Sequence, residues 1–144
     1  MQSPLSKVAF ALMVAGIVGL YYMNSLVGAS PAVIGLQVCG AALMIWARLT
    51  FGKRSFHAAA TPTAGGLVTT GPYRYLRHPI YTAIFIFVWP PAIAQRAAAP
   101  IAFATLILIG AVIRMWCEEY LLVRQYPDYA VYAKTTKRIV PYLF

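Results

Sequence analysis

Charged residues are scarce in this sequence, and acidic residues are the scarcest. Only 10% of the 144 residues are charged and three are acidic, whereas 61% are hydrophobic. A soluble domain carries about 25% charged residues, so this composition argues against a soluble fold and indicates a membrane protein. The long apolar runs also lack the alternation that a membrane-spanning barrel needs. The sequence therefore predicts an all-α fold, an integral membrane helical bundle of about four transmembrane helices in a single domain.

Cysteine pairs and a nucleotide-binding glycine loop are missing as well. Cys39 and Cys117 lie in or beside apolar segments, with no spacing that suits zinc or a disulfide framework. We interpret both as packing residues and predict no metal site. Gly65 and Gly66 lie in an irregular segment without a preceding strand, so a doubly wound nucleotide-binding fold is not expected.

Basic residues are plentiful by comparison, and their placement predicts an orientation in the membrane. Twelve Lys and Arg residues give a net charge of +9. They lie between and after the apolar runs rather than in one solvated patch, so we predict no nucleic-acid partner. We expect both termini to be cytoplasmic, in a bacterial inner membrane or its equivalent, with Arg96 on the outer side. The basic residues on the inner side are then Arg48, Lys53, Arg54, Arg74, Arg77, Arg124, Lys134, Lys137 and Arg138.

Five segments have the pattern of helices. Ser30 and Pro31 favour a helix start, and Pro79 suits the first turn of another helix. The predicted helices cover residues 5–27, 32–49, 80–94, 97–113 with a continuation through Arg124, and 128–136. An alternative for the first segment is a cleaved signal peptide, which the further apolar runs after it disfavour. Residues 51–77 are predicted to form a long irregular loop.

Two parts are expected within the single domain. Residues 1–51 form an N-terminal helical hairpin, and residues 71–141 form the half that carries the candidate site. Whether residues 80–94 cross the membrane fully stays open, because the segment is short and contains Pro90 and Pro91. The predicted orientation brings the end of the loop, the end of the last long helix and the tail to one membrane face.

Two of the three acidic residues are adjacent and follow an uncharged helix. Glu118 and Glu119 come one turn after Arg114. The simplest interpretation is an ion pair between Arg114 and Glu118, which are four residues apart on one helical face. However, charged groups close to lipid are costly and tend to be functional, and that pair does not explain the second carboxylate. We therefore interpret both glutamates as candidate site residues.

A second candidate cluster lies where the loop is predicted to become a helix. Arg77 and His78 directly precede Pro79, and the free backbone N–H groups of a helix start favour an anionic group. Simpler roles are capping or packing for His78 and headgroup contact for Arg77. His57 has no neighbours that suggest chemistry.

The two clusters belong to one longer motif in the C-terminal half. It consists of Tyr73, Arg74, Tyr75, Leu76, Arg77, His78, Pro79, Ile80 and Tyr81, followed by Arg114, Glu118, Glu119, Leu122, Tyr129, Tyr132, Arg138 and Pro141. This motif resembles that of the isoprenylcysteine carboxyl methyltransferase family and the related phospholipid methyltransferases. The order and spacing of the Arg-His-Pro and Glu-Glu blocks carry the resemblance, whereas the first two spans match only in being apolar.

The resemblance implies a pocket for S-adenosylmethionine at the cytoplasmic ends of the last helices. This cofactor is cationic at its sulfur and amino group, so carboxylates in a basic protein suit it. Glu118 or Glu119 would hold its ribose hydroxyls or ammonium group. The implied cofactor-binding residues are His78, Tyr81, Glu118, Glu119, Tyr129 and Arg138, and the implied catalytic residues are Arg77, Arg114 and Glu118.

The class of acceptor decides what the catalytic residues must do. A carboxylate is ionised near neutral pH and needs no general base, so Arg77 or Arg114 would only have to orient it. An amine must lose a proton, which would give His78 or a glutamate the role of base. We expect carboxyl methylation of a lipophilic or lipidated acceptor that enters from the membrane lipid. The alternatives are a phospholipid or amine N-methyltransferase, an NADPH-dependent membrane reductase, and a noncatalytic membrane scaffold.

Overall fold

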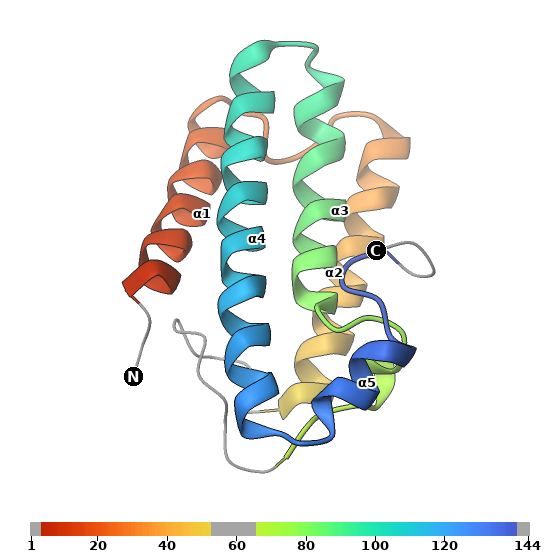
Figure 1. The fold of residues 1–144 in the computed structure, drawn as a ribbon. Helices are drawn as coiled ribbons and strands as arrows, with labels where there is room; N and C mark the ends of the chain where they lie inside the picture. The colour runs from red at the N-terminus through yellow and green to blue at the C-terminus, as the bar shows by residue number, and fades with distance from the viewer. Residues whose placement is uncertain (1–3, 53–65, 141–144) are drawn as a thin grey trace.

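The computed structural model describes residues 4–52 and 66–140, which form helices joined by short connections (Figure 1). The helices are α1 (Pro4–Tyr22), α2 (Pro31–Phe51), the 3-10 helix η2 (Gly71–Arg74), α3 (Pro79–Ala94), α4 (Ala98–Gln125) and α5 (Tyr129–Thr135). No β-strand occurs in these ranges, and the predicted all-α fold is confirmed. Lys53, Arg54, His57, Gly65 and Pro141, named above, lie outside the described residues.

Three helices, α1, α2 and α4, are long and apolar enough to cross a membrane. Helix α3 is also apolar but has 16 residues, about 24 Å of helix, which is less than the roughly 30 Å of a hydrocarbon core. Helix α4 has 28 residues, about 42 Å, so its last turns extend past the lipid core. The chain is therefore a helical membrane bundle, and whether α3 crosses fully stays open.

Helix boundaries follow local signals, with two departures from expectation. The Ser30 side chain accepts a hydrogen bond from the Val33 backbone N–H at 3.3 Å, which caps the start of α2. Helix α1 ends at Tyr22, five residues before the expected boundary, and the chain then turns through Asn24 with a positive φ of 49°. The predicted loop 51–77 contains the unexpected η2, where Gly71 adopts a φ of 57°.

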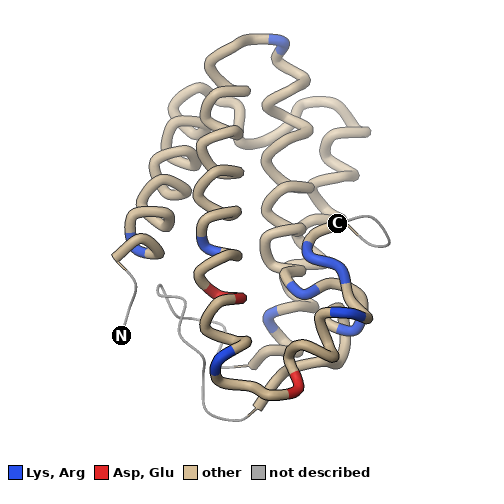
Figure 2. The backbone as a smooth tube through the Cα atoms, viewed as in Figure 1, with Lys and Arg blue, Asp and Glu red and all other residues tan. Residues whose placement is uncertain are grey.

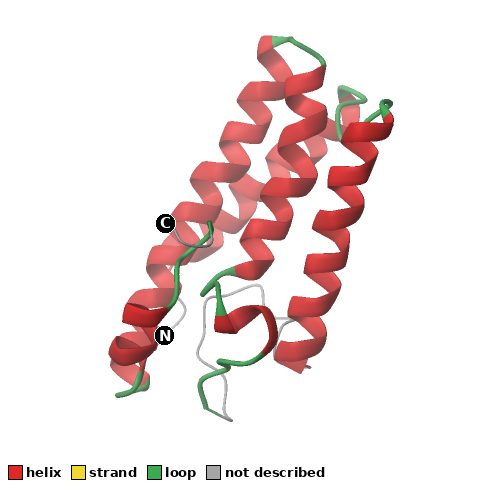
Figure 3. Ribbon diagram, turned by 90° about the vertical axis from the view of Figure 1, so that its right-hand side faces the viewer, coloured by secondary structure: helices red, strands yellow, loops and turns green. Residues whose placement is uncertain are grey.

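The helices pack in the spatial order α1, α4, α3, α2 (Figure 1). Figure 3 shows the same bundle turned by 90°. Helix α1 packs along α4 and α2 packs along α3, while α3 and α4 contact each other more sparsely. Thus α1 and α2, which are joined by a short connection, each pack mainly on a helix from the C-terminal half. Leu20, Ile107 and Met115 are among the largest fully buried side chains.

Two glycines allow α1 and α4 to approach each other closely. A Cβ atom on Gly110 would lie 2.5 Å from the Ala9 carbonyl oxygen, and one on Gly16 would lie 2.5 Å from Cγ1 of Ile107. Both distances are too short for a side chain. Within lipid the hydrophobic effect does not favour helix association, because lipid tails are as apolar as the side chains. Close backbone packing of this kind is therefore a main source of helix association in membranes.

A buried glutamine joins α2 to α3 near two prolines. Pro91 lies inside α3 and has no N–H for the Phe87 carbonyl four residues earlier. The side-chain amide of Gln37 donates a hydrogen bond to that carbonyl at 3.0 Å and another to the Leu26 carbonyl at 2.8 Å. Its oxygen accepts from the Gly28 N–H at 2.9 Å. Gln37 therefore satisfies a carbonyl that the proline leaves without its helical partner.

Helix α5 and the residues after it fold back over the ends of α3 and α4 (Figure 1). Leu76 and Lys137 form a single parallel β-bridge. The backbone N–H of Arg77 donates to the Lys137 carbonyl at 2.7 Å, and that of His78 donates to the Arg138 carbonyl at 3.0 Å. Figure 2 shows basic residues gathered at this end of the bundle. These contacts bring the tail beside the start of α3.

Candidate functional site

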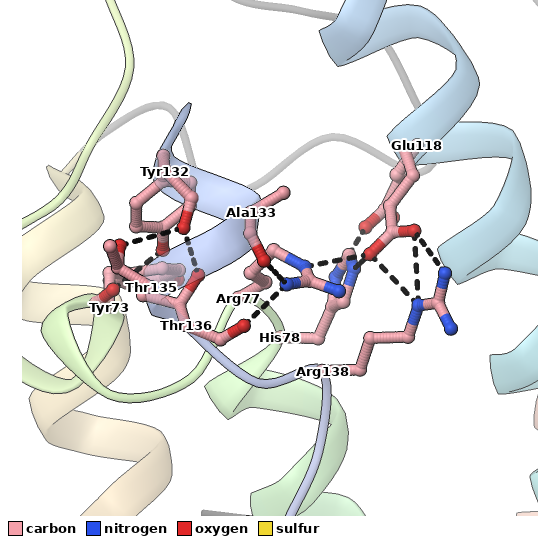
Figure 4. Close-up of polar contacts among 10 residues, drawn as sticks. Tyr73, Arg77, His78, Glu118, Tyr132, Ala133, Thr135, Thr136 and Arg138 are labelled. Carbon is pink, nitrogen blue, oxygen red and sulfur yellow. Dashed lines mark hydrogen bonds and ion pairs between the residues drawn. The ribbon is translucent and has the colours of Figure 1, made fainter. Parts of the chain in front are cut away.

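The start of α3 and the last part of α4 bring the two predicted clusters together (Figure 4). Arg77 and His78 precede α3 because Pro79 occupies its first turn. Glu118 and Glu119 lie on α4 where that helix leaves the apolar segment. Since α3 and α4 are neighbours in the bundle, the Arg-His pair and the two carboxylates meet at one end of it.

Glu119 is bonded to cations from two different segments. Its Oε1 atom accepts a hydrogen bond from Arg77 Nε at 3.0 Å and lies 3.3 Å from His78 Nε2. Its Oε2 atom lies 3.1 Å from both Nε and one terminal nitrogen of Arg138. Charge-assisted bonds of this kind are about twice as strong as neutral ones. Glu119 therefore ties α4 to the start of α3 and to the tail.

Glu118 lies in a second set of polar contacts. The Tyr81 hydroxyl donates to Glu118 Oε1 at 2.5 Å, and Arg114 Nε donates to the Tyr81 hydroxyl oxygen at 2.9 Å. A terminal nitrogen of Arg114 lies 3.5 Å from the same carboxylate oxygen. The simple ion pair between Arg114 and Glu118 is therefore present, and Tyr81 extends it across to α3. The Arg114 guanidinium also lies over the Phe10 ring of α1 at 5.5 Å.

His78 lies between the two carboxylates. Its Nδ1 atom is 3.5 Å from Glu118 and its Nε2 atom is 3.3 Å from Glu119. Burial by itself lowers the pKa of the imidazole, but the bonds and charge attraction from both glutamates outweigh it, so the pKa of His78 is raised above 6.5. The carboxylate at each ring nitrogen favours the imidazolium, a form of the side chain that donates from both nitrogens and has no lone pair to offer.

Arg77 connects the cluster to α5. One terminal nitrogen of its guanidinium donates to the Ala133 carbonyl at 2.7 Å and to the Thr136 carbonyl at 2.5 Å, while Nε bonds Glu119 (Figure 4). The two carbonyls lie at the end of α5, where the last carbonyls of a helix have no partners within it. Arg77 thus caps α5 and fixes it against the glutamate pair.

Two tyrosines of α5 complete this side of the cluster. Tyr132 donates to the Tyr73 carbonyl at 2.6 Å, and burial raises the pKa of Tyr132 to about 12. Burial and the charge of Glu119 also raise the pKa of Tyr129. The Tyr129 hydroxyl is buried and has no hydrogen-bond partner within the part of the chain that the structure describes. A buried hydroxyl without a partner costs roughly 1–3 kcal/mol, so a bound molecule that accepts its hydrogen would stabilise the site.

All eight side chains predicted for the site lie in or beside this one cluster. They are Arg77, His78, Tyr81, Arg114, Glu118, Glu119, Tyr129 and Arg138. Their assignment to cofactor or acceptor stays a prediction. Two features of the cluster were not predicted. One is the Thr82 hydroxyl, which donates to the Ile139 carbonyl at 2.8 Å, and the other is the pair of carbonyls of Ala133 and Thr136 that Arg77 bonds. Backbone acceptors carry no side-chain signature, so the sequence offered no signal for them.

The cluster combines charges of both signs. It holds the guanidinium groups of three arginines, one imidazole and two carboxylates within a few hydrogen bonds of each other. Glu118 and Arg138 are its most exposed charged side chains, at 25% and 36%. Carboxylates beside guanidinium groups fit a ligand that carries both an ammonium and a carboxylate. Among residues 4–52 and 66–140, no three His, Cys, Asp or Glu side chains are arranged as a metal site.

Comparison with known proteins identifies relatives that are longer than this chain. The nickel-cobalt-cadmium resistance protein NccN of Alcaligenes xylosoxydans xylosoxydans is 40% identical over 80 residues, covering 54% of this chain and 37% of NccN. The cobalt-zinc-cadmium resistance protein CzcN of Cupriavidus metallidurans is 29% identical over 123 residues, covering 79% of this chain and 51% of CzcN. The chain thus spans about half or less of the length of these curated relatives. No solved structure matches.

A family model described as phospholipid methyltransferase matches residues 30–129. The match includes the Arg-His-Pro segment at the start of α3, the glutamate pair on α4, and Tyr129. It covers well over half of the 144 residues. The chain therefore belongs to the phospholipid methyltransferase family.

Proposed function

We propose that the protein is a membrane methyltransferase that uses S-adenosylmethionine and methylates a lipophilic acceptor entering from the bilayer. The observation that carries this proposal is the cluster of Glu118 and Glu119 with Arg77, His78 and Arg138 at the end of the bundle where α4 extends past the apolar helices. Family membership supports the reaction class. The position of the cluster supports a lateral route, because it lies where α4 passes the edge of the hydrocarbon.

The donor set of the site fits S-adenosylmethionine. When bound, that molecule supplies an electrophilic methyl group on a cationic sulfur. Its amino-acid end carries an ammonium and a carboxylate, which match Glu118 and Arg138, the most exposed charged side chains of the cluster. The Tyr129 hydroxyl, which has no partner among the described residues, adds a buried donor near Glu119. Bonds from Arg77 and His78 keep Glu119 ionised and in place.

The state of His78 favours a carboxylate as the acceptor. A carboxylate reacts in the ionised form that it already has at neutral pH, whereas an amine must first give up a proton to a base. His78 faces a carboxylate at each ring nitrogen, which favours the protonated ring, and in that form the ring has no lone pair to act as a base. Arg77, bonded to Glu119 and α5, and Arg114, bonded to Tyr81 and Glu118, are the two arginines that we assign as candidates for orienting the acceptor. Orientation of two held reactants can contribute several kcal/mol to the rate.

A phospholipid amine is the second candidate acceptor. The description of the family model favours it. In that case Glu118, the more exposed carboxylate, would have to take the proton, since it is the glutamate that an acceptor can reach.

The direct test is incubation of the purified chain in nanodiscs with methyl-labelled S-adenosylmethionine and membrane lipid extract. We expect label in the lipid fraction that mild base releases as volatile methanol, because a methyl ester hydrolyses to methanol and a carboxylate, whereas an N-methyl group stays on its nitrogen. Label that stays non-volatile after base treatment would indicate the amine as acceptor. If no label is transferred and no S-adenosylmethionine is retained, the methyltransferase proposal is wrong.

Binding of the donor can be tested separately with neutral glutamate variants. Glu118→Gln and Glu119→Gln are each expected to weaken S-adenosylmethionine binding about tenfold or more, the scale of one charge-assisted bond. Asp128→Asn is the matched control, because Asp128 is the third acidic residue and makes no ion pair with a described residue. Affinities are measured by equilibrium dialysis. Equal affinities in all three variants would show that the two glutamates do not bind S-adenosylmethionine.

A further inference from the structure

Three exposed cations and three exposed apolar side chains lie together outside the long helices. We call this surface the basic rim, and it consists of Arg74, Tyr75, Val131, Lys134, Lys137 and Val140. Tyr75, Val131 and Val140 are 50%, 66% and 43% exposed. Within the described ranges, none of the three cations forms an ion pair. The rim therefore carries positive charge that the described chain does not neutralise.

Backbone and side-chain bonds hold the parts of the rim together. The Lys137 N–H donates to the Tyr75 carbonyl at 3.2 Å, beside the Leu76–Lys137 bridge. The Tyr132 hydroxyl ties α5, which carries Val131 and Lys134, to the Tyr73 carbonyl in η2. In Figure 2 basic residues of η2, α5 and the tail lie near one another at this end. The rim is thus one fixed surface and not three unrelated segments.

This surface lies at the level where lipid headgroups would be. The residue before Val140, Ile139, accepts a hydrogen bond from the Thr82 hydroxyl at 2.8 Å in the first turn of α3. That turn marks the edge of the apolar helices, and α4 passes the same edge near Glu118. Exposed apolar side chains mixed with lysines at this depth are the composition of segments that lie in a membrane interface.

We propose that the basic rim binds the phosphate groups of anionic phospholipids in the surrounding leaflet. Lys134, Lys137 and Arg74 supply the charge, and Val131, Tyr75 and Val140 enter the boundary between headgroups and acyl chains. Asp128, at the start of α5, is the acidic residue on this part of the chain and opposes the attraction only in part. The inference concerns the membrane around the protein and does not depend on the methyl-transfer reaction.

Lipid binding at the rim would also act on the polar cluster. Lys137 is adjacent to Arg138, which contacts Glu119. The tail is held at the start of α3 by the bonds from Arg77 and His78. Attraction between Lys137 and anionic headgroups would hold the tail at the membrane surface. In that position the next residue, Arg138, contacts Glu119. Anionic lipid should therefore order the tail and the end of α5 together.

Hydrogen–deuterium exchange of the full chain in nanodiscs tests the proposal. Discs contain phosphatidylcholine alone or with increasing phosphatidylglycerol, and the amides of residues 129–140 are followed. We expect slower exchange as phosphatidylglycerol increases, and reversal at high salt. In the Lys134→Gln/Lys137→Gln variant, the phosphatidylglycerol content that gives half of the protection should rise roughly tenfold. Lys134→Arg/Lys137→Arg should respond as the parent does, and so should Arg96→Gln, which alters a cation between α3 and α4.

The outcomes separate the sources of phosphate and the effects of misfolding. Soluble glycerophosphate added to phosphatidylcholine discs should give no protection; protection there would mean a free phosphate site and would overturn lipid binding. If the exchange of residues 129–140 in the parent protein does not change with phosphatidylglycerol content, lipid binding at the rim is also overturned. An unchanged response in the glutamine variant would overturn it as well, provided that exchange in α4 shows the variant to be folded. If the glutamine variant is not folded, the Lys134→Arg/Lys137→Arg variant decides instead. Because it keeps both charges, the absence of a response to phosphatidylglycerol in that variant would overturn the proposal.

Discussion

His78 shows how the neighbours of one side chain set its chemistry. A buried imidazole alone would stay neutral at pH 7, but the carboxylates of Glu118 and Glu119 at its two ring nitrogens favour the charged form. The charge in turn helps to hold two like-charged carboxylates close together. The same contacts make His78 a positioning group for the glutamates and an unsuitable base.

The protonation of His78 leads to a pH prediction. Its pKa is raised in the folded chain, so its contribution to stability is fully present below about 6.5, the ordinary value, and is lost as pH rises through the folded pKa. In a His57→Gln background, the ring ¹⁵N signals of His78 should therefore titrate above pH 6.5. Thermal stability in detergent should fall over the same interval.

The control for this prediction removes the carboxylates and keeps the burial. In a Glu118→Gln/Glu119→Gln variant, burial becomes the main influence, and the pKa of His78 should fall below 6.5. A pKa that is the same with and without the two carboxylates would contradict the arrangement of charges described for the site.

At the scale of single elements, α3 depends on a side chain from α2. Gln37 satisfies the Phe87 carbonyl that Pro91 leaves unbonded, and it also bonds two backbone groups in the connection between α1 and α2. Unsatisfied backbone groups are especially costly in lipid, where water cannot replace the missing partner. One polar residue therefore permits both a proline in α3 and a tight turn before α2.

A double-mutant cycle tests this role of Gln37. Gln37→Leu should lower the free energy of unfolding by about 1–3 kcal/mol, measured by denaturant titration in detergent. Pro91→Ala restores an N–H for Phe87, so the double variant should lose less than the two single effects added together. Gln95→Leu removes one exposed bond to the Asn24 carbonyl and should cost less than Gln37→Leu. Strict additivity would show that Gln37 and Pro91 are not coupled through that carbonyl.

The contact of α1 with α4 provides a second prediction for an element. Gly110→Ala would place a Cβ atom 2.5 Å from the Ala9 carbonyl oxygen and 2.7 Å from Cγ of Met13, so the helices must separate. We expect a loss of about 1–3 kcal/mol in unfolding free energy. Gly35→Ala is the matched control, because nothing lies within 4 Å of its added carbon. That variant should be neutral or slightly more stable, since alanine favours helix.

At the scale of the whole molecule, the distribution of charge predicts the orientation in the membrane. Helix α5 lies at one end of the bundle, and the connection between α3 and α4, which contains Arg96, lies at the opposite end (Figure 1). Basic segments are retained on the cytoplasmic side. In a background without Cys39 and Cys117, an impermeant maleimide should label Lys134→Cys only from the cytoplasmic side and Arg96→Cys only from the other. The reverse pattern would place the candidate site outside the cell.

The sequence alone determined the elements of this fold and most members of its candidate site. Long uncharged runs can only be helices in lipid, because backbone bonding within a helix is local, so the predicted helices lie close to α1, α2, α3, α4 and α5. The spacing of the Arg-His-Pro and Glu-Glu blocks identified side chains that the structure places together. What those side chains bind and methylate stays a prediction.

Only the tertiary structure decided which helices pair and how the charges are shared. An apolar helix face does not specify which other helix it packs against. The sequence therefore did not reveal that α1 packs on α4 and α2 on α3. No role was predicted for Gln37, because its partner, the Phe87 carbonyl, is 50 residues away in the sequence. The capping of α5 by Arg77 also uses backbone carbonyls, which every residue has. Such contacts depend on distances that folding creates between remote segments, and local sequence patterns do not contain them.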